Sequence, residues 1–321
     1  MHISLFLFIF AEKCVLMSMN YGFEAGLSLM PNKGKHLLFE DCLYLNDNIG
    51  DSTSPDNIYL YKGFPVKISF AMGGVCLHGN CILRVNLIKY KLKAGDHIVI
   101  PQGSIIDFFW GSLDLEYYQM CFVDPKFSVL MNSDMVLSYQ KEIMNQTIVT
   151  TLCETAIKGF LETYRLIRLV VEDDTIINKR AVLGGYIYAI GQWLFSEMKS
   201  QNALEKKQPR NRNDEVFRNF KEHIQQYYQQ HRNVSFYAEL AHLSPKYFGQ
   251  IILKASGRNP TDWISDLVIL DAKTMLLSGQ YSIQQISDAL NFPNSSFFAK
   301  YFKEHVGCAP GKFSFEFESK V

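Results

Sequence analysis

The chain has 321 residues, of which 48% are hydrophobic and 20% are charged, a composition typical of a soluble globular protein long enough for two domains. Its 32 Lys and Arg residues balance its 32 Asp and Glu residues, so no overall field attracts a polyanion. Any binding of nucleic acid must therefore depend on the local placement of basic side chains.

The seven cysteines are scattered along the chain, without a C-x-x-C pair or a nearby pair of histidines. This pattern favours reduced, mostly buried thiols over disulfides or a zinc site. We expect a cytoplasmic protein with no cofactor and no bound metal.

The amino-terminal sequence MHISLFLFIFAEKC contains an apolar run from Ile3 to Phe10. The run has no basic segment before it and no small-residue cleavage site after it, and it is far shorter than the roughly 20 residues that span a bilayer. We therefore expect no export and no membrane contact. Residues 1–20 are assigned either to an arm or to an extension ahead of a working start at Met17 or Met19.

Residues 21–132 are expected to form a β domain. From about Phe39 to Phe122, short β-branched and aromatic runs such as VKISFAM, CILRVNLIKYKL and IDFFW are separated by Gly, Pro, Asp and Asn. Evenly spaced runs of this kind, without a long helical pattern between them, predict a small antiparallel barrel or sandwich.

The pattern changes after the β region. Between residues 133 and 198 apolar side chains recur every three or four positions, which predicts helices. Residues 199–213, KSQNALEKKQPRNRN, contain almost nothing to bury, and Pro209 discourages a continuous helix, so this stretch is expected to be a linker. From residue 214 to 321 the chain again reads as helical, with a first cap expected at Asn213 or Asp214.

This last region contains an internal repeat with an offset of 50 residues. The matched positions are Phe248, Gly257, Pro260 and Trp263 in one block and Phe298, Gly307, Pro310 and Phe313 in the other. Ahead of each block, a short helical run opens at a hydroxyl residue, Ser235 or Ser282, which is expected to cap it. A short helix, a tight turn and a second helix form a helix-turn-helix, whose second helix can lie in the major groove of DNA.

A long helix is expected between the two blocks. It is predicted to start after Thr261 or Asp262 and to end at Gly279, a residue suited to a helix C-cap.

The span from about 214 to 315 resembles the DNA-binding domain of the AraC/XylS family of bacterial transcription regulators. The segments SPKYFGQIILKASGRNPTDWI and AKTMLLSGQYSIQQISDALNFPNSSFFAKYFKEHVGCAP, in that order, carry the resemblance. It covers about a third of the chain and rests on two linked motifs. It implies an all-α, bihelical helix-turn-helix domain that binds double-stranded DNA.

The stretch NFPNSSFFAKYF separates rings from small and basic residues. Helical spacing puts Phe297, Phe298, Tyr301 and Phe302 on one side, expected to be buried, and leaves the hydroxyl, methyl and lysine groups mostly on the other. Those groups suit base edges, thymine methyls and phosphates, and the alternative is a solvated helix face. The residues predicted to contact DNA are Ser244, Lys246, Tyr247, Gly249 and Gln250 in the first motif, and Asn294, Ser295, Ser296, Ala299, Lys300 and Lys303 in the second.

The first motif departs from the family pattern. Gln250 stands where an arginine is common, and Gly249 offers no side chain. His242 and Asn291 occupy turn positions where glycine is frequent, which bears on turn geometry. Residues 214–321 hold 11 Lys and Arg against 11 Asp and Glu, so we expect modest non-specific binding, with several of the acids segregated from the lysines of the second helices.

The stretch LKAGDHIVIPQGSIIDFFWGSLDLEYYQMCFVD resembles, more loosely, the second half of a cupin-type sensor barrel, the usual partner of this DNA-binding domain in the family. The expected fold class is therefore α+β multidomain, with an amino-terminal cupin-like β-barrel, a helical dimerisation region and the carboxy-terminal domain. Strand residues that are candidates for contact with a small-molecule effector are Phe70, Met72, Arg84, Phe108, Trp110 and Tyr118. The alternatives are simple core positions and, for Arg84, a surface position or a salt bridge.

A cupin enzyme is the rival interpretation, and it would need a metal held by a close histidine pair, an acid and a later histidine. His78 stands alone, and Asp107 falls near where the later histidine would be wanted. We therefore expect no catalytic residues, and assign His36, His78 and His97 to structural or surface positions.

Side chains at steps of three and four between residues 150 and 198 predict an apolar helix face. Ile157, Leu161, Tyr164 and Arg168 are candidates for a homodimer surface, and packing against the chain's own barrel is the alternative. The sequence thus predicts a sequence-specific DNA-binding transcription regulator that responds to a small-molecule effector. A regulator without an effector, a metal-dependent cupin enzyme and a pure oligomerisation module remain as alternatives.

Overall fold

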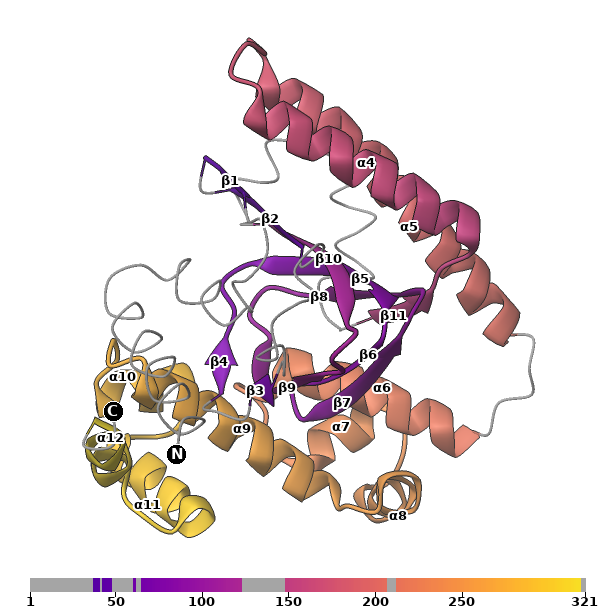
Figure 1. Ribbon diagram of the computed structural model, residues 1–321. Coiled ribbons are helices and arrows are strands. Elements are labelled where there is room, and N and C mark those ends of the chain that lie inside the picture. The colour runs from indigo at the N-terminus through magenta and orange to yellow at the C-terminus, as the bar shows by residue number, and fades with distance from the viewer. Residues whose placement is uncertain are drawn as a thin grey trace. The chain divides into compact units, whose positions relative to one another are not determined.

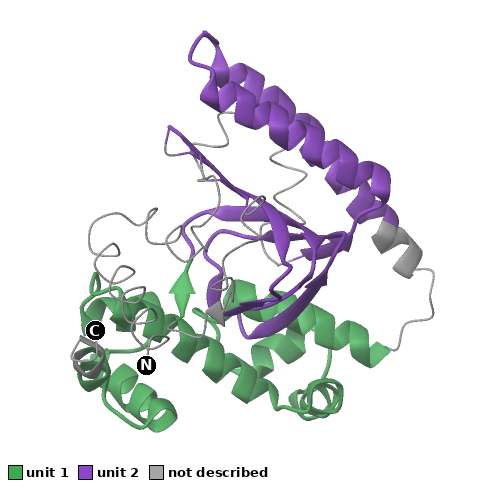
Figure 2. Cartoon of the chain, viewed as in Figure 1, with its two compact units in different colours: residues 1–25, 63–67, 209–321 green, residues 26–62, 68–208 purple. Residues whose placement is uncertain are grey.

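The computed structural model describes residues 37–40, 42–47, 60–61, 65–122, 148–206 and 212–318. The chain divides into two compact units (Figure 2): residues 1–25, 63–67 and 209–321 form unit 1, and residues 26–62 and 68–208 form unit 2. Residues 1–20, assigned from the sequence either to an arm or to an extension ahead of the working start, lie outside the described residues.

Unit 2 is built on two antiparallel sheets (Figure 1). The first has the strand order β1-β2-β10-β5-β8-β11, and the second follows the order β3-β9-β6-β7. The strands of the first sheet are β1 (Leu37–Phe39), β2 (Leu43–Asp47), β5 (Ala71–His78), β8 (Asp96–Ile100), β10 (Glu116–Phe122) and β11 (Ile148–Thr151). Those of the second are β3 (Leu60–Tyr61), β6 (Asn80–Val85), β7 (Ile88–Lys93) and β9 (Ile105–Gly111). The described strands thus pair as two sheets and do not form one closed barrel.

Buried and exposed side chains alternate along β6, as expected of a strand with one face covered by the rest of unit 2. Cys81, Leu83 and Val85 are buried, whereas Asn80 and Arg84 on the opposite face are exposed. A period of two is what a strand with one covered face requires, because successive side chains point to opposite sides of the sheet.

A helical hairpin of α4 (Glu154–Glu172) and α5 (Lys179–Lys206) completes unit 2 (Figure 1). The buried stripe of α4, which includes Phe160, Tyr164 and Ile167, packs into one core cluster with strand residues such as Leu45 and Met120. The helices therefore cover the apolar face of the first sheet, and spacing of three and four along α4 reflects that contact.

Two boundaries differ from the sequence-based expectation. Residues 148–151 form β11, which pairs with β8, although region 133–198 was predicted to be mostly helical. Helix α5 continues to Lys206, well into the segment expected to be linker. The run ALEK at residues 203–206 consists of good helix formers, so it extends a helix that is already nucleated.

Unit 1 is all-helical over residues 212–318 and also contains the short strand β4 (Val66–Lys67). Its helices are α6 (Arg212–Tyr227), α7 (Val234–Leu240), α8 (Pro245–Ser256), α9 (Pro260–Leu277), α10 (Ile283–Ala289), α11 (Ser295–Val306) and α12 (Pro310–Glu318). Helices α7 and α8 form the first helix-turn-helix, α10 and α11 form the second, and α9 is the long helix between them (Figure 1).

The caps of α8 and α11 repeat at the predicted offset of 50 residues. The side chain of Ser244 accepts a hydrogen bond from the Tyr247 amide, and that of Asn294 accepts from the Ser296 and Phe297 amides. Each helix ends on a glycine in the left-handed region, Gly257 with φ 72° and Gly307 with φ 90°. These start and stop signals define both second helices independently of tertiary packing.

The cap of α10 is also as predicted, whereas that of α7 is not. Ser282 and Gln285 form a reciprocal capping box at the start of α10. Helix α7 starts earlier than expected, because Asn233 caps it and accepts a hydrogen bond from the Ser235 amide. The predicted cap at Ser235 is therefore wrong, and α9 likewise starts earlier than predicted, at Pro260.

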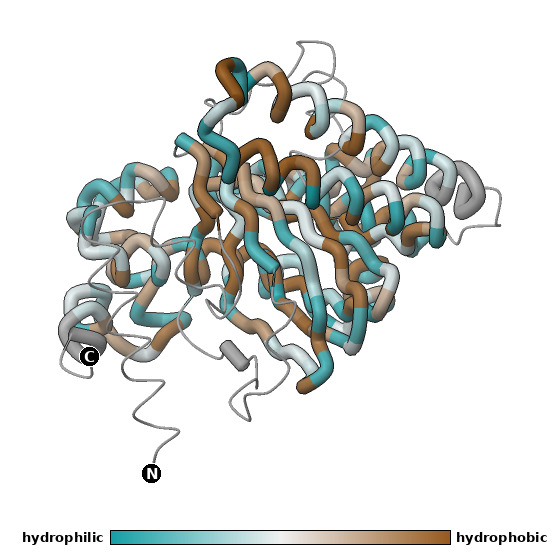
Figure 3. Tube along the Cα trace, turned by 45° about the horizontal axis from the view of Figure 1, so that its top comes forward, coloured by the Kyte–Doolittle hydropathy of each residue, from teal (hydrophilic) through white to brown (hydrophobic). Residues whose placement is uncertain are grey.

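The two turns differ in length by one residue. Leu243 and Phe292, 49 positions apart, each donate an amide hydrogen bond to a carbonyl in the preceding short helix, of Ala238 and Ser287 respectively. The caps that follow are 50 positions apart, and Pro293 is the inserted residue. In the view coloured by hydropathy, hydrophobic and hydrophilic segments alternate along the helices of both units (Figure 3), as expected of helices that bury one face.

Candidate nucleic-acid interface

Buried rings fix the inner face of the second helix of each motif. Phe248 and Ile252 on α8 and Phe298 and Phe302 on α11 are at most 1% exposed. The Phe248 ring meets Phe220 of α6 edge to face, with ring centroids 5.4 Å apart. The Phe302 ring meets Phe313 of α12 at 5.5 Å. With these side chains seated in separate aromatic clusters, each helix has one free outer face.

On α8, the predicted DNA-facing residues lie on that outer face. Lys246, Tyr247 and Gln250 are exposed. A Cβ built on Gly249 would meet nothing within 4 Å, so its backbone borders open space. Basic and amide side chains near the start of a helix can reach both phosphates and base edges.

On α11, Ser296, Lys300 and Lys303 are exposed and Ser295 and Ala299 are half-buried. Lys300 lies 4.0 Å from Glu304, a loose pair between largely exposed side chains that contributes little to stability. Glu304, which is not among the acids expected to be segregated, therefore lies beside one lysine of α11.

Ser244 and Asn294 are the caps of their helices, so their side-chain oxygens already accept backbone hydrogen bonds. A contact with DNA would have to use the remaining capacity of each group. Their replacement would also destabilise the helix start by about 1 kcal/mol, so these two positions cannot test DNA contact alone.

Phe297 is the main departure from the predicted pattern. It was assigned to the buried side, yet its ring is 59% exposed. Its match 50 positions earlier is Tyr247, which is 47% exposed. On a helix, residues one position apart differ by about 100° in direction, so Phe297 and the fully buried Phe298 cannot share one narrow stripe. The repeat pairs Phe297 with Tyr247, a residue predicted to contact DNA, and this match could have predicted that Phe297 is exposed.

Both turns use left-handed backbone at a residue other than glycine. His242 and Asn291 each have a φ of 54°. Asparagine tolerates this conformation better than histidine, and the Asn291 side chain also donates a hydrogen bond of 3.1 Å to the carbonyl of Gln230.

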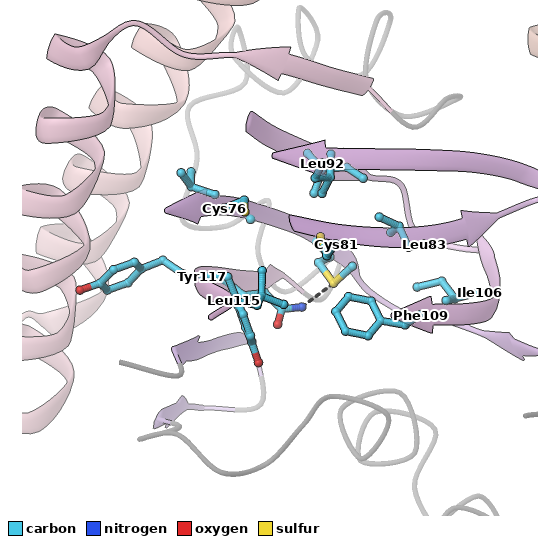
Figure 4. A pocket seen from close by; sticks show the side chains of 14 residues that line it. Cys76, Cys81, Leu83, Leu92, Ile106, Phe109, Leu115 and Tyr117 are labelled. Carbon is cyan, nitrogen blue, oxygen red and sulfur yellow. Dashed lines mark hydrogen bonds between the residues drawn. The ribbon is translucent and has the colours of Figure 1, made fainter. Parts of the chain in front are cut away.

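In unit 2, a cavity of about 90 Å³ lies between the strands (Figure 4). Of the six residues predicted to contact an effector, Met72 and Tyr118 line it. The other lining residues are Gly74, Val75, Cys76, Cys81, Leu83, Leu92, Ile98, Ile106, Phe109, Leu115, Tyr117 and Gln119. The period-two pattern would have found Cys81 and Leu83, because they alternate with Arg84 on β6.

The cavity lining is almost wholly uncharged. Burial raises the pKa of the Cys76 thiol to about 11 and that of Cys81 to about 12, so both stay protonated at neutral pH. The side-chain amide nitrogen of Gln119 donates a hydrogen bond to the Met72 sulfur.

The remaining effector candidates lie elsewhere. Arg84 forms two hydrogen bonds of 2.7 Å to the Asp107 carboxylate, which raises its pKa, and so follows the salt-bridge alternative. Phe70 is fully buried core, and Phe108 and Trp110 are half-buried on β9. The structure therefore brings Met72 and Tyr118 together at the cavity and leaves Phe70, Arg84, Phe108 and Trp110 outside its lining.

The four candidates for a dimer surface pack within unit 2. Tyr164 has no exposed surface, and Ile157 and Leu161 pack against the core cluster. Arg168 donates a hydrogen bond of 2.8 Å to Asp47 on β2. These four residues therefore pack against the chain's own β domain, which was the alternative to a dimer surface.

Within the described part of the chain, no group of three or more His, Cys, Asp or Glu side chains is arranged to hold a metal ion. His97 is buried and His78 is largely exposed, while His36 lies outside the described residues. No described helix is both long enough and apolar enough to cross a membrane.

Comparison with known proteins gives a family match to the same region. The family model of a helix-turn-helix domain matches residues 237–314, from within α7 of the first motif through the whole second motif. The HTH-type transcriptional regulator YobQ of Bacillus subtilis is 34% identical over 73 residues, a stretch that covers 23% of this chain and 30% of YobQ. The raffinose operon transcriptional regulatory protein RafR of Pediococcus pentosaceus is 21% identical over 257 residues, covering 78% of this chain and 87% of RafR.

Among solved structures, ToxT from Vibrio cholerae is similar at 14% identity and a TM-score of 0.35, over 85% of this chain and 98% of ToxT. A TM-score this low does not define the fold by itself. The two capped motifs and the family match show that residues 237–314 hold a helix-turn-helix domain, and this region is similar to that of HTH-type transcriptional regulators.

Proposed function

We propose that the protein is a sequence-selective regulator of transcription that reads DNA with the outer faces of α8 and α11 and responds to a small molecule bound in unit 2. The observation that supports DNA reading most strongly is the repeat itself. Two capped helices, 50 residues apart, present polar and basic side chains at matching exposed positions, while their other faces hold separate aromatic clusters. Nothing in this activity calls for catalysis, and we propose that the protein is not an enzyme and acts in the cytoplasm.

The DNA-contacting residues that we propose are those predicted from the sequence, with Phe297 added. Lys246 and Lys300 contact phosphates or guanine, and Gln250 and Ser296 donate or accept hydrogen bonds at base edges. The Phe297 ring makes an apolar contact with a thymine methyl. Phe297 qualifies because its side chain, near the start of α11, is 59% exposed.

A pair of lysines on the same helix tests this proposal. Lys246 is near the start of α8 and Lys254 is in its last turn, and both side chains are exposed. Because a recognition helix reads DNA with its amino-terminal residues, Lys246→Ala should weaken binding to DNA selected in vitro by the full-length protein about tenfold or more. Lys254→Ala removes the same charge and should change binding by less than about threefold. Equal effects of the two substitutions would contradict the assigned face.

On the second helix, Lys300→Ala combined with Ser296→Ala should abolish selectivity between selected and random DNA. Both substitutions spare the Asn294 cap, so the fold is retained and circular dichroism should be unchanged. An unchanged footprint in this double variant would exclude α11 as a reader.

The effector that we propose is compact, apolar and uncharged. The support is the cavity of about 90 Å³, whose lining is almost free of polar surface and has both thiols protonated. A charged ligand there would lose its hydration without gaining a partner, whereas small apolar cavities can bind benzene-sized molecules.

Thermal unfolding with a panel of neutral aromatic and alicyclic molecules of about ten heavy atoms or fewer tests the effector. A ligand at about 100 times its Kd stabilises the protein by about 2.7 kcal/mol, and Leu83→Trp should abolish that shift by filling the cavity. If no member of the panel shifts the unfolding temperature, the regulator without an effector becomes the better description.

We also propose that the protein acts as a homodimer, which would increase the affinity of a domain with no net charge through effective concentration. The exposed apolar face of α4 supports this, since Leu169 is 60% exposed and Leu166 is 40% exposed. Leu169→Lys should convert a dimer to a monomer in sedimentation equilibrium, while Ile157→Lys should instead destabilise the fold. A wild-type monomer at micromolar concentration would reject the dimer.

A further inference from the structure

The loop between α6 and α7 reaches across the DNA-binding domain to the turn of the second motif. Arg232 in this loop donates hydrogen bonds to the carbonyl oxygens of Leu290 and Asn291, the latter at 2.8 Å. Its guanidinium also stacks 3.9 Å from the ring centroid of Phe292. Three successive residues of the second turn are thus held by one side chain from the first half of the domain.

The contact is reciprocal. The Asn291 side chain donates a hydrogen bond of 3.1 Å to the carbonyl of Gln230, two residues before Arg232. Residues 230–232 and 290–292 are therefore joined through groups on both sides, although they lie about 60 positions apart in the sequence.

Arg232 is placed for the turn and not for DNA. Its side chain is half-buried, and burial lowers its pKa. Among the described residues, no carboxylate pairs with it, so the carbonyl oxygens at the end of α10 and the face of Phe292 offset its loss of hydration. The end of a helix is where a cation is favoured, because its last carbonyls have no partner within the helix.

The contact continues into the second recognition helix. The Phe292 ring packs against Phe298 and Tyr301 of α11, with ring centroids 5.4 Å and 5.2 Å apart. Movement of the turn relative to Arg232 would therefore displace the rings that seat α11.

Without this contact, the first motif would be joined to α10 and α11 mainly through α9 and the short segment 278–282. That segment contains Gly279 with φ 64°. Because α9 also packs against α10 and α11, a change in the orientation of α11 would need both a rotation in this segment and a shift of that packing. A second attachment point closes a loop between the motifs, which restricts such rotation.

We propose that Arg232, with Asn291, is a positioning device that fixes the separation and orientation of the two recognition helices and thereby makes the protein sensitive to the spacing between the two halves of its DNA site. Arg232 touches no base in this assignment and acts through the turn. The inference rests on the proposed reading of DNA by both α8 and α11.

The test uses the full-length protein and duplexes that it selects from random sequence, with one base pair then inserted between the two contacted blocks. Such an insertion rotates one block against the other by about 35° and moves it by about 3.4 Å. The wild type should lose binding about tenfold or more on insertion. Arg232→Ala should lose less than about threefold, because a freer α11 can follow the displaced block.

Arg258→Ala is the matched control. Arg258 also combines a ring contact, 5.0 Å from Trp263, with a polar partner, Asp266, but its partners lie within eight positions of it in the sequence. It should keep the wild-type sensitivity to spacing.

Two milder variants cover the case in which Arg232→Ala fails to fold. Arg232→Lys keeps the charge but loses the paired donors, and Asn291→Gly keeps the left-handed turn while removing the bond to Gln230. Each should relax spacing sensitivity in part. If folded Arg232→Ala, or both milder variants, discriminate against the insertion as strongly as the wild type, the positioning role is refuted. If the wild type itself selects no DNA sequence, the proposed function fails instead.

Discussion

Tyr228, just beyond α6, donates a hydrogen bond of 2.6 Å to the carboxylate of Asp271 on α9, a side chain with no exposed surface. Gln229 donates to the same oxygen at 2.8 Å, and Lys67, which belongs to the same compact unit, pairs with the carboxylate at 2.8 Å. Burial and the neighbouring charge raise the pKa of Tyr228, so its hydroxyl remains a donor. A buried carboxylate depends on each of its donors, because water cannot replace them.

Tyr228→Phe should therefore lower the free energy of unfolding by about 1–3 kcal/mol, the usual effect of removing a donor from a buried charged group. Urea denaturation of the full chain followed by circular dichroism measures it. Tyr247→Phe removes a hydroxyl from an exposed ring and should change stability by less than about 0.5 kcal/mol. Similar losses for both variants would argue against a special role for the Asp271 cluster.

Two glycines of the first motif have equally open surroundings and different backbones. A Cβ at either Gly249 or Gly257 meets nothing within 4 Å, but only Gly257 has a positive φ, 72°. Gly249→Ala should stabilise the protein by about 0.5–1 kcal/mol through higher helix propensity. Gly257→Ala should destabilise it by about 1 kcal/mol because alanine is strained in the left-handed region. Changes of the same sign in thermal unfolding would contradict this explanation.

His97 on β8 should make the stability of unit 2 depend on pH. Burial lowers its pKa to about 4 from the usual 6.5, so the unfolded state binds a proton in this range that the folded state does not. The free energy of unfolding should then be constant above about pH 6.5, fall between pH 6.5 and 4, and drop by about 2 kcal/mol from pH 7 to pH 5.

Replacement of the imidazole checks this assignment. In His97→Leu the loss of stability from pH 7 to pH 5 should shrink to whatever other groups contribute. His78→Gln changes a largely exposed histidine and should retain the full slope. A slope that survives His97→Leu would assign the titration to another residue.

Gly159 on α4 allows the indole of Trp193 on α5 to approach closely. A Cβ built on Gly159 would lie 2.4 Å from a ring carbon of Trp193, so Gly159→Ala must displace the ring and should destabilise the hairpin by about 1–3 kcal/mol. Tryptophan fluorescence should move to longer wavelength as the ring becomes more exposed. Gly185→Ala, on α5 with nothing within 4 Å of its Cβ, should show neither effect.

Local rules were sufficient to predict most of the carboxy-terminal domain from its sequence. Gly257, Gly307 and Ser282 are end signals whose physical meaning does not depend on neighbours, and they stand at helix ends in the structure. The error at Ser235 arose because two polar residues, Asn233 and Ser235, compete for the same cap and only backbone geometry decides between them. Phe297 was misplaced because aromatic character was equated with burial.

The amino-terminal half was less predictable because its pairings are long-range. Strand β11 pairs with β8 across about 50 residues of sequence. A strand of four residues has too short a hydrophobic pattern to predict which distant strand it will pair with. The sequence indicated strands that could hold a ligand, but which of their two faces borders the cavity depends on register. Met72 and Tyr118 face the cavity, while Arg84 meets Asp107 on β9.

The extra residue in the second turn, Pro293, has a consequence for how the protein meets a promoter. With unequal turns and different outer residues, Gly249 and Gln250 against Ala299 and Lys300, the two motifs are not interchangeable. A DNA site bound by one chain therefore has a direction, because its two halves are bound by different motifs. Inverting that site in front of a gene should reverse the orientation of the bound protein relative to the gene. The effect on transcription should then depend on the orientation of the site.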